Sequence, residues 1–359
     1  MSSQSNTFTE TSPLGDLRVL DLTTLLPGPL ASHMLSKSGA DVIKIERPPM
    51  GDDMRHLNAT DTLFKLLNGG KRSVMADLKN ASDVSDITNL IKTADILIEQ
   101  FRPGVMARLG LGYDDLRKIN PKLIYCSITG FGQTGPLSGV AGHDLNYLAE
   151  SGLLSLGAMP EGNPVIPPTL IADIAGGSYP AVVNILLAVI ERQKTGFGCH
   201  LDVAMTDNIA PFMLSALSAV HDYNKNPAPG GELLSGGSPR YQIYKCKDKK
   251  HLAVAALEEK FWNNFCQCID LVNELRLESA DPDDVINAIT EIIAGQNSDH
   301  WQRLFSGKDV CCNIVSSVTE AINNPHFIER GTFQVYNDNA KEPGQLKPTE
   351  LHKIKWKNY

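Results

Sequence analysis

Leu17-Arg-Val-Leu-Asp-Leu22 and Asp41-Val-Ile-Lys-Ile-Glu-Arg47 are two short apolar runs, each with the length and composition of a β-strand. Between them, Thr23 to Gly28 has the composition of a turn, and Leu30 to Lys37 predicts a helix that ends near Gly39. A strand, a helix and a strand in this order make a βαβ unit. Its two strands are expected to be parallel and joined by a right-handed crossover.

The same alternation continues along the chain. Strands are predicted over Val74–Leu78, Ala94–Gln100 and Leu123–Ile128, and a helix is predicted over Asp83–Thr93. Strands that alternate with helices are typical of doubly wound domains. The expected fold class is therefore α/β, with a parallel, Rossmann-like sheet in a large domain.

A change of composition marks the end of this domain. From Asn224 to Pro239 the chain is rich in Pro, Gly, Asn and Ser, which indicates a linker. Strands predicted over Tyr241–Lys245 and His251–Leu257, followed by helices, indicate a small α+β domain. The predicted organisation is a flexible tail (1–15), a large α/β domain (16–223), a linker (224–240), a small α+β domain (241–313) and a return segment toward the large domain (314–359).

Composition narrows the function classes. The net charge of −8 over 359 residues argues against a nucleic-acid partner and against a polybasic membrane anchor. No apolar run is expected to reach the length of a membrane span, so no membrane partner is predicted. The seven cysteines form no C-x-x-C pair and no H-E-x-x-H occurs, so no metal site is predicted. Reduced thiols and the lack of a signal-peptide pattern predict a cytoplasmic protein.

A dinucleotide site is a natural alternative for the first βαβ unit. Glu46 ends the second strand, where a ribose-binding acid would lie. However, the first turn, Leu25-Leu-Pro-Gly-Pro-Leu30, lacks G-x-G-x-x-G. Without those glycines the backbone cannot approach a pyrophosphate closely, so NAD binding is disfavoured and Glu46 is interpreted as a strand-end acid.

Basic residues gather at predicted strand ends. Lys44 with Arg47 and Lys71 with Arg72 form two groups, and Arg102 forms a third. Parallel sheets bind ligands at the carboxyl ends of their strands, and Arg suits phosphate. Each residue alone fits a solvated surface charge, but together they indicate a polyphosphate ligand.

His143 and Asp173 are the candidate acid/base residues. Each lies in a glycine-flanked turn that leads into an apolar run. An aspartate near a helix start is also a good N-cap, and an isolated histidine is often structural. A histidine nevertheless exchanges a proton near neutral pH, and a carboxylate at a helix start is stabilised as a base or a nucleophile. Hydrolysis by a Ser-His-Asp triad is disfavoured because no G-x-S-x-G elbow is present.

Taken in order, the motifs resemble the class III CoA-transferase superfamily (CaiB/BaiF type), and within it the α-methylacyl-CoA racemases. The stretches that carry the resemblance are Leu17–Leu22, Pro27-Gly-Pro29, Gly39–Pro48, Gly70–Ser73, Phe101-Arg-Pro-Gly104, Gly130-Phe-Gly132, Gly142–Tyr147, Asp173 with its glycines, Gly236–Pro239, Val254–Glu258 and Pro325–Arg330.

This resemblance implies a parallel-sheet large domain, a small domain and an interlocked homodimer. It implies an acyl-CoA substrate and no cofactor beyond the CoA moiety. His143 and Asp173 match the two acid/base residues of the racemases, and Glu258 matches an acidic residue that lines the racemase site. The stretches that bind CoA contain four cations, which are Arg47, Lys71, Arg72 and Arg102.

Two activities remain open at this point. In the transferases the residue at the Asp173 position is a nucleophile that carries the acyl group, so Asp173 fits both reactions. His143 favours the racemase, because transferases more often place Tyr there. We therefore expect racemisation of 2-methylacyl-CoA through an enolate, with CoA transfer between carboxylic acids as the alternative. A non-catalytic acyl-CoA-binding protein is a third and weaker hypothesis.

Overall fold

A computed structural model describes residues 12–57, 61–157, 163–330 and 332–333. Predictions made for residues 1–11 and 334–359 lie outside these ranges. The chain divides into two compact units. Among the described residues, the first unit contains those of 12–151, 167–212 and 328–333, and the second contains those of 152–166 and 213–327.

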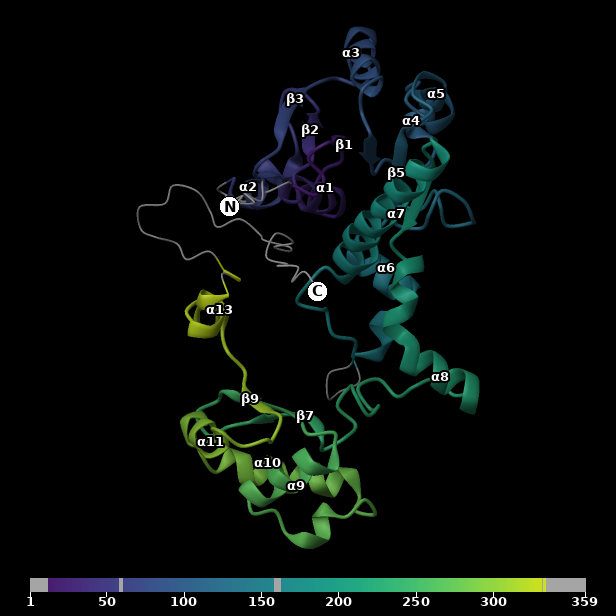
Figure 1. The fold of residues 1–359 in the computed structure, drawn as a ribbon. Helices are drawn as coiled ribbons and strands as arrows, with labels where there is room; N and C mark the ends of the chain where they lie inside the picture. The colour runs from purple at the N-terminus through teal and green to yellow at the C-terminus, as the bar shows by residue number, and fades with distance from the viewer. Residues whose placement is uncertain (1–11, 58–60, 158–162, 331, 334–359) are drawn as a thin grey trace, which may run out of the picture. The chain divides into compact units, whose positions relative to one another are not determined.

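The first unit is built on a six-stranded sheet (Figure 1). Its strands are β1 (Arg18–Leu22), β2 (Asp41–Glu46), β3 (Arg72–Met75), β4 (Ile96–Glu99), β5 (Ile124–Thr129) and β6 (His200–Ala204). They pair in the order β3-β2-β1-β4-β5-β6, and every pair is parallel. The predicted parallel α/β sheet is confirmed. Strands β1 to β3 are added toward one edge of the sheet and strands β4 to β6 toward the other. In such a doubly wound sheet a crevice forms at the carboxyl ends of β1 and β4, where the strand order reverses.

Helices of the first unit connect these strands. They are α1 (Pro27–Lys37), α2 (Thr62–Asn68), α3 (Ala81–Ile91), α4 (Val105–Arg108), α5 (Tyr113–Ile119), α6 (Asp144–Glu150) and α7 (Tyr179–Thr195), and a π-helical turn, η3 (Ala172–Ser178), leads into α7. The sequence prediction placed β3 at Val74, two residues too late. All four residues of this edge strand are exposed, so Arg72 and Ser73 gave no apolar signal.

The helix α7 corrects the expectation that no apolar segment reaches the length of a membrane span. Together with η3 it forms a helical segment, Ala172–Thr195, that is long and apolar enough to span a membrane. Its Ala181, Ile185 and Ala188 are buried, and α7 packs against β5 and β6. The segment is therefore a layer of the α/β unit, and its apolar residues are explained in part by that packing.

The second unit contains a three-stranded antiparallel sheet in the order β7 (Tyr241–Lys245), β8 (His251–Ala255) and β9 (Cys312–Ile314). Its helices include α8 (Leu214–Tyr223), α9 (Glu259–Cys268), α10 (Pro282–Ala294), α11 (Ser298–Phe305) and α12 (Val318–Ile322), and α13 (Pro325–Glu329) follows. Trp262, Phe265 and Trp301 lie in one core with Ile289. Gly152–Ile166 and α8 group with this unit rather than with residues 16–223, and none of the side chains of α8 is buried.

Candidate active site

A pocket of about 470 Å³ lies in the first unit, where several strands end. Residues that follow β1, β4 and β6 line it together with the last residues of β5, so it occupies the crevice expected for a doubly wound sheet. The lining residues used below are Leu25, Pro27, Gln100, Arg102, Gly130, Phe131, Gly142, His143, Asn146, Tyr147, Asp173 and Met205.

His143 lies in this pocket, directly before α6. Its backbone N–H donates to Asn146 Oδ1 over 3.1 Å, which fixes the start of the helix. Tyr147 packs one turn further on, and its hydroxyl donates to the Gly142 carbonyl. A Cβ at Gly130 would lie 2.2 Å from the Tyr147 ring and one at Gly142 would lie 2.7 Å from it. These glycines are needed because the ring occupies the space beside their backbone.

Asp173 lines the same pocket from η3, so the structure brings the two predicted acid/base residues together. Burial, reinforced by the nearby Asp144 carboxylate, raises the pKa of Asp173 to about 7. The glycines that follow allow close packing, since a Cβ at Gly176 would lie 2.5 Å from the Met205 carbonyl oxygen. The site therefore contains a carboxyl group that exchanges its proton near neutral pH.

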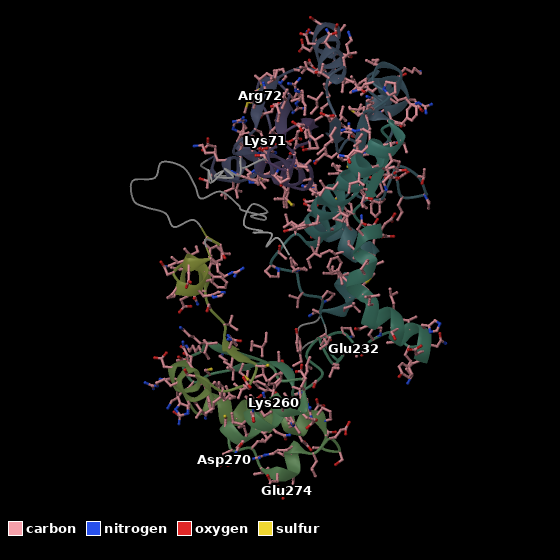
Figure 2. The ribbon with its side chains drawn as sticks, viewed as in Figure 1. Lys71, Arg72, Glu232, Lys260, Asp270 and Glu274 are labelled. Atoms are coloured by element: carbon pink, nitrogen blue, oxygen red, sulfur yellow. The ribbon has the colours of Figure 1, made fainter. Side chains whose placement is uncertain are left out.

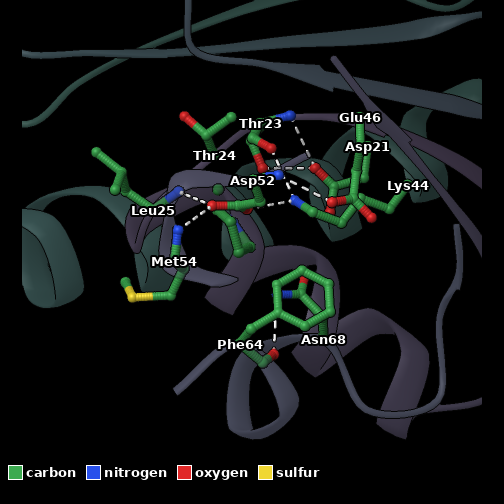
Figure 3. Close-up of polar contacts among 12 residues, drawn as sticks. Asp21, Thr23, Thr24, Leu25, Lys44, Glu46, Asp52, Met54, Phe64 and Asn68 are labelled. Atoms are coloured by element: carbon green, nitrogen blue, oxygen red, sulfur yellow. Dashed lines mark hydrogen bonds and ion pairs between the residues drawn. The ribbon is translucent and has the colours of Figure 1, made fainter. Parts of the chain in front are cut away.

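A buried polar network holds the turn after β1 against this pocket (Figure 3). Lys44 Nζ donates to the Thr23 carbonyl over 2.8 Å and pairs with Asp52 at 2.9 Å. Asp52 Oδ1 in turn accepts the Leu25 N–H at 3.1 Å. Leu25 has a φ of 62°, an unfavourable conformation for leucine, and these contacts stabilise it.

Gln100, the residue directly after β4, holds the same turn. Its Nε2 donates to the Thr24 carbonyl over 2.7 Å, and its Oε1 accepts the Gly28 N–H at 3.2 Å. Sequence reasoning did not single out Gln100. Its position as a polar residue directly after a buried strand is the signal that could have identified it.

The four predicted CoA-binding cations have different environments. Arg102 is exposed and lines the pocket, and Arg47 is exposed directly after β2. Lys71 is buried, where its Nζ contacts Asp21, Asn68 and the Pro29 carbonyl. Arg72, labelled in Figure 2, is the first residue of β3 and therefore lies at the amino end of that strand. There its guanidinium binds both Asp41 carboxylate oxygens, at 2.6 and 2.7 Å.

Glu99, the last residue of β4, lines a smaller cavity of about 200 Å³ that Arg102 also borders. The Glu99 carboxylate accepts the Phe101 N–H at 2.8 Å, and Ser127 Oγ is 2.9 Å from His200 Nε2. Burial raises the pKa of Glu99 to about 7, although hydrogen bonds from Ser127 and Phe101 oppose the shift.

Glu258 belongs to the second unit, where it is exposed and directly precedes α9. Among the described residues, no group of three or more His, Cys, Asp or Glu side chains is arranged to hold a metal ion.

A parallel α/β sheet with a histidine and a protonatable carboxyl group at its carboxyl edge defines a site for acid–base chemistry. Residues 14–357 match the model of CoA-transferase family III. The chain therefore belongs to this family of enzymes, which implies acyl-CoA chemistry on CoA-thioester substrates.

Relatives with two different activities lie at similar identity. The chain is 35% identical over 334 residues to α-methylacyl-CoA racemase of Mus musculus, covering 92% of this chain and 84% of the relative. It is 33% identical over 331 residues to acetyl-CoA:oxalate CoA-transferase of Acetobacter aceti, covering 89% and 84%. The crystal structure of a CaiB/BaiF family protein from Brucella suis superposes with a TM-score of 0.81 at 28% identity, covering 94% of this chain and 92% of that one.

Proposed function

We propose that the protein racemises 2-methylacyl-CoA thioesters by removing and returning the α-proton. One observation carries the proposal, which is that His143 and a protonatable Asp173 line a single pocket. A general acid/base works best with a pKa near the operating pH, and the pKa of Asp173 is raised to about 7. A carboxyl nucleophile, in contrast, must be ionised to attack.

In the proposed reaction, one of His143 and Asp173 takes the α-proton and leaves an enolate. The other residue then gives a proton to the opposite face of the same carbon, and the exchanged roles run the reverse direction. A positioned base supplies about 10²–10⁴-fold of rate. The remaining rate enhancement requires stabilisation of the negative charge on the enolate oxygen. The N–H of Asp173 is engaged with Asp144, which leaves the Asp144 N–H at the start of α6 as the proposed donor.

For the CoA moiety we propose Arg102 as the main phosphate partner, because it is exposed and lines the pocket. Arg47 is a second partner, since it is exposed beyond the carboxyl end of β2. We leave Lys71 and Arg72 out of this role because both bind aspartates of the sheet. The role of Glu258 and the cytoplasmic location remain predictions from the sequence.

We also propose that the working form is a homodimer. Tyr179, Val183, Leu186, Leu187 and Ile190 recur at helical spacing along α7, and all are exposed. An apolar stripe on one face of a helix is typical of a buried contact, and a second copy of the chain supplies it here.

Sedimentation velocity tests the dimer. The wild type should sediment as a dimer at micromolar concentration, and Leu187→Glu should shift it to the monomer. Asn184→Asp adds a charge at an exposed position of the same helix that lies away from the stripe, and it should leave the dimer intact. A monomeric wild type excludes the proposal.

The alternative function is CoA transfer between carboxylic acids with Asp173 as nucleophile. It is favoured by the similarity to acetyl-CoA:oxalate CoA-transferase.

The decisive experiment incubates one enantiomer of a 2-methylacyl-CoA with the protein in D₂O, with and without a free carboxylic acid. Racemisation predicts α-deuteration with loss of configuration in the absence of added acid. Transfer predicts acid-dependent exchange of CoA without α-deuteration. Asp173→Asn and His143→Gln should each reduce deuteration by at least about 100-fold. Glu150→Gln, at the far end of α6, is the control, and full activity in His143→Gln contradicts the assignment.

A further inference from the structure

Asp144 joins the two segments that carry the proposed acid/base residues. It is the first residue of α6 and directly follows His143. Its Oδ1 accepts the backbone N–H of Asp173 over 2.9 Å. The same carboxylate accepts hydrogen bonds from the backbones of Ala172 and Ile171. Only 5% of Asp144 is exposed, so these contacts are shielded from water.

The three N–H groups belong to the first turn of a helix. Helical hydrogen bonding begins with the Ile174 N–H, which donates to the Leu170 carbonyl. The N–H groups of the first turn have no partner within the helix itself. Asp144 therefore caps this helix from a different segment of the chain, in a position that favours negative charge.

Such a cap matters more here than at an ordinary helix start. The turn η3, Ala172–Ser178, is π-helical and contains Gly176 and Gly177, and both features weaken a helix. Asp173 lies within this turn, so its backbone position depends on an external anchor. Asp144 provides that anchor one residue after His143.

We propose that Asp144 is a positioning residue that holds Asp173 and His143 at a fixed separation across the pocket. This inference rests on the proposed α-proton transfer. It differs from that proposal because Asp144 itself exchanges no proton with the substrate. A displacement of about 1 Å between reacting groups costs on the order of 100-fold in rate, so the anchor should act mainly on kcat.

Asp144 also sets the charge that faces Asp173. Burial raises the pKa of Asp173 to about 7, and the Asp144 carboxylate contributes to the shift. The other titratable or charged groups of the pocket are His143, Tyr147 and Arg102. Replacing Asp144 with a neutral side chain removes the neighbouring negative charge, which lowers the pKa of Asp173.

Two variants separate position from charge. Asp144→Asn removes the charge and replaces one acceptor oxygen with an NH₂ group that cannot accept these hydrogen bonds. Asp144→Glu keeps the charge and displaces it by one methylene. Glu150→Gln, on the same helix, removes an exposed acid and serves as the matched control.

The measurement is the pH profile of α-deuteration of a 2-methylacyl-CoA in D₂O, with kcat and KM determined separately. Asp144→Asn should lower kcat about 10–100-fold, leave KM within about twofold, and move the acid limb to lower pH. Asp144→Glu should lower kcat without moving the acid limb, and Glu150→Gln should match the wild type. If Asp144→Asn does not fold, the split between kcat and KM in Asp144→Glu decides.

The inference is overturned if an active wild type and both Asp144 variants share the same kcat and acid limb. It is also overturned if the variants raise KM and leave kcat unchanged, because Asp144 would then act on binding. A wild type that shows no α-deuteration refutes the proposed function instead, so the two failures are distinguishable.

Discussion

Buried carboxyl groups have lowered pKa values in one half of the central sheet and raised pKa values in the other half. On the β1–β3 side, Asp21 is fully buried, yet its pKa lies well below the usual range. Burial alone would raise it, but Lys71, Lys44 and two hydroxyl groups outweigh burial. Glu46 follows the same rule, since the Arg55 guanidinium and the Ser73 hydroxyl overcome burial and lower its pKa to about 2.

On the β4–β5 side, the same kind of group has no such compensation. The pKa of Glu99 and that of Asp173 are both raised to about 7, and that of Asp144 is also raised, in each case chiefly by burial. The described hydrogen-bond partners of the Glu99 and Asp144 carboxylates are backbone N–H groups and the Ser127 hydroxyl.

The difference teaches that burial by itself does not assign a role to an acid. Cation partners turn a buried carboxylate into a permanent anion that stabilises the fold. Without them, burial raises the pKa of the group, and for Glu99 and Asp173 the pKa reaches about 7, where a carboxyl group is available for proton exchange. The pocket lies on the uncompensated side, and three tests address this contrast.

Removal of Lys71 should have the largest effect. Its side chain is 1% exposed and pairs with Asp21 at 3.1 Å, so Lys71→Met leaves a buried carboxylate without its nearest cation. Breaking such a pair costs about 3–5 kcal/mol of unfolding free energy. Urea denaturation at pH 7 measures the loss. Lys65→Met is the control, because the Lys65–Asp61 pair is half-exposed and contributes about 0–0.5 kcal/mol. Equal effects in both variants would contradict the contrast.

A smaller loss is expected from the hydroxyl that supports Asp21. The Ser32 hydroxyl is buried and donates to the Asp21 carboxylate, so Ser32→Ala should destabilise the protein by about 1–3 kcal/mol. Ser36→Ala, one turn along α1, removes a hydroxyl with a weak, exposed contact of 3.4 Å and should change little. The comparison of the two midpoints in urea tests whether charge-assisted bonds stabilise this half.

The smallest effect concerns the pH dependence of stability. The pKa of Asp173 is higher in the folded protein than in an unfolded chain, so the folded state binds this proton more tightly. That stabilisation is complete below about pH 4 and is lost as the pH rises through about 7. Asp173→Asn should therefore lose less thermal stability than the wild type between pH 5 and pH 8.5.

Thermal unfolding at both pH values measures this difference, and Glu150→Gln is the exposed-acid control. Asp21 has the opposite sign. Its depressed pKa gives stability that is present above about pH 4 and is lost in acid. An Asp173→Asn variant with the same alkaline loss as the wild type would exclude a raised pKa at Asp173.

Local sequence patterns predicted the parallel sheet and the two candidate acid/base residues. The alternation of apolar strands with helices was enough to predict the parallel sheet, because buried parallel strands are apolar on both faces. His143 and Asp173 were found because each lies in a short glycine-flanked motif. The short helix α5 was not predicted, because only one of its residues is buried, and the edge strand β3 was predicted two residues too late, because none of its residues is buried.

The partners of charged residues required the tertiary structure. Lys71 and Arg72 are adjacent in the sequence and were both assigned to CoA. In the fold, Lys71 lies beside Asp21, fifty residues away, and Arg72 binds Asp41. Nothing in the sequence reveals that the Asp144 carboxylate caps a helix 29 residues later.

The sequence by itself determined the α/β class, the family motifs and the residue types available for acid–base chemistry. These depend on local periodicity and short spacing, which a linear chain contains in full. The tertiary structure decided which buried carboxyl groups pair with a cation, as Asp21 and Glu46 do, and which are raised in pKa by burial, as Glu99 and Asp173 are. That distinction separates the acids that hold the sheet together from those that exchange a proton, because a pKa depends on neighbours brought together only by folding.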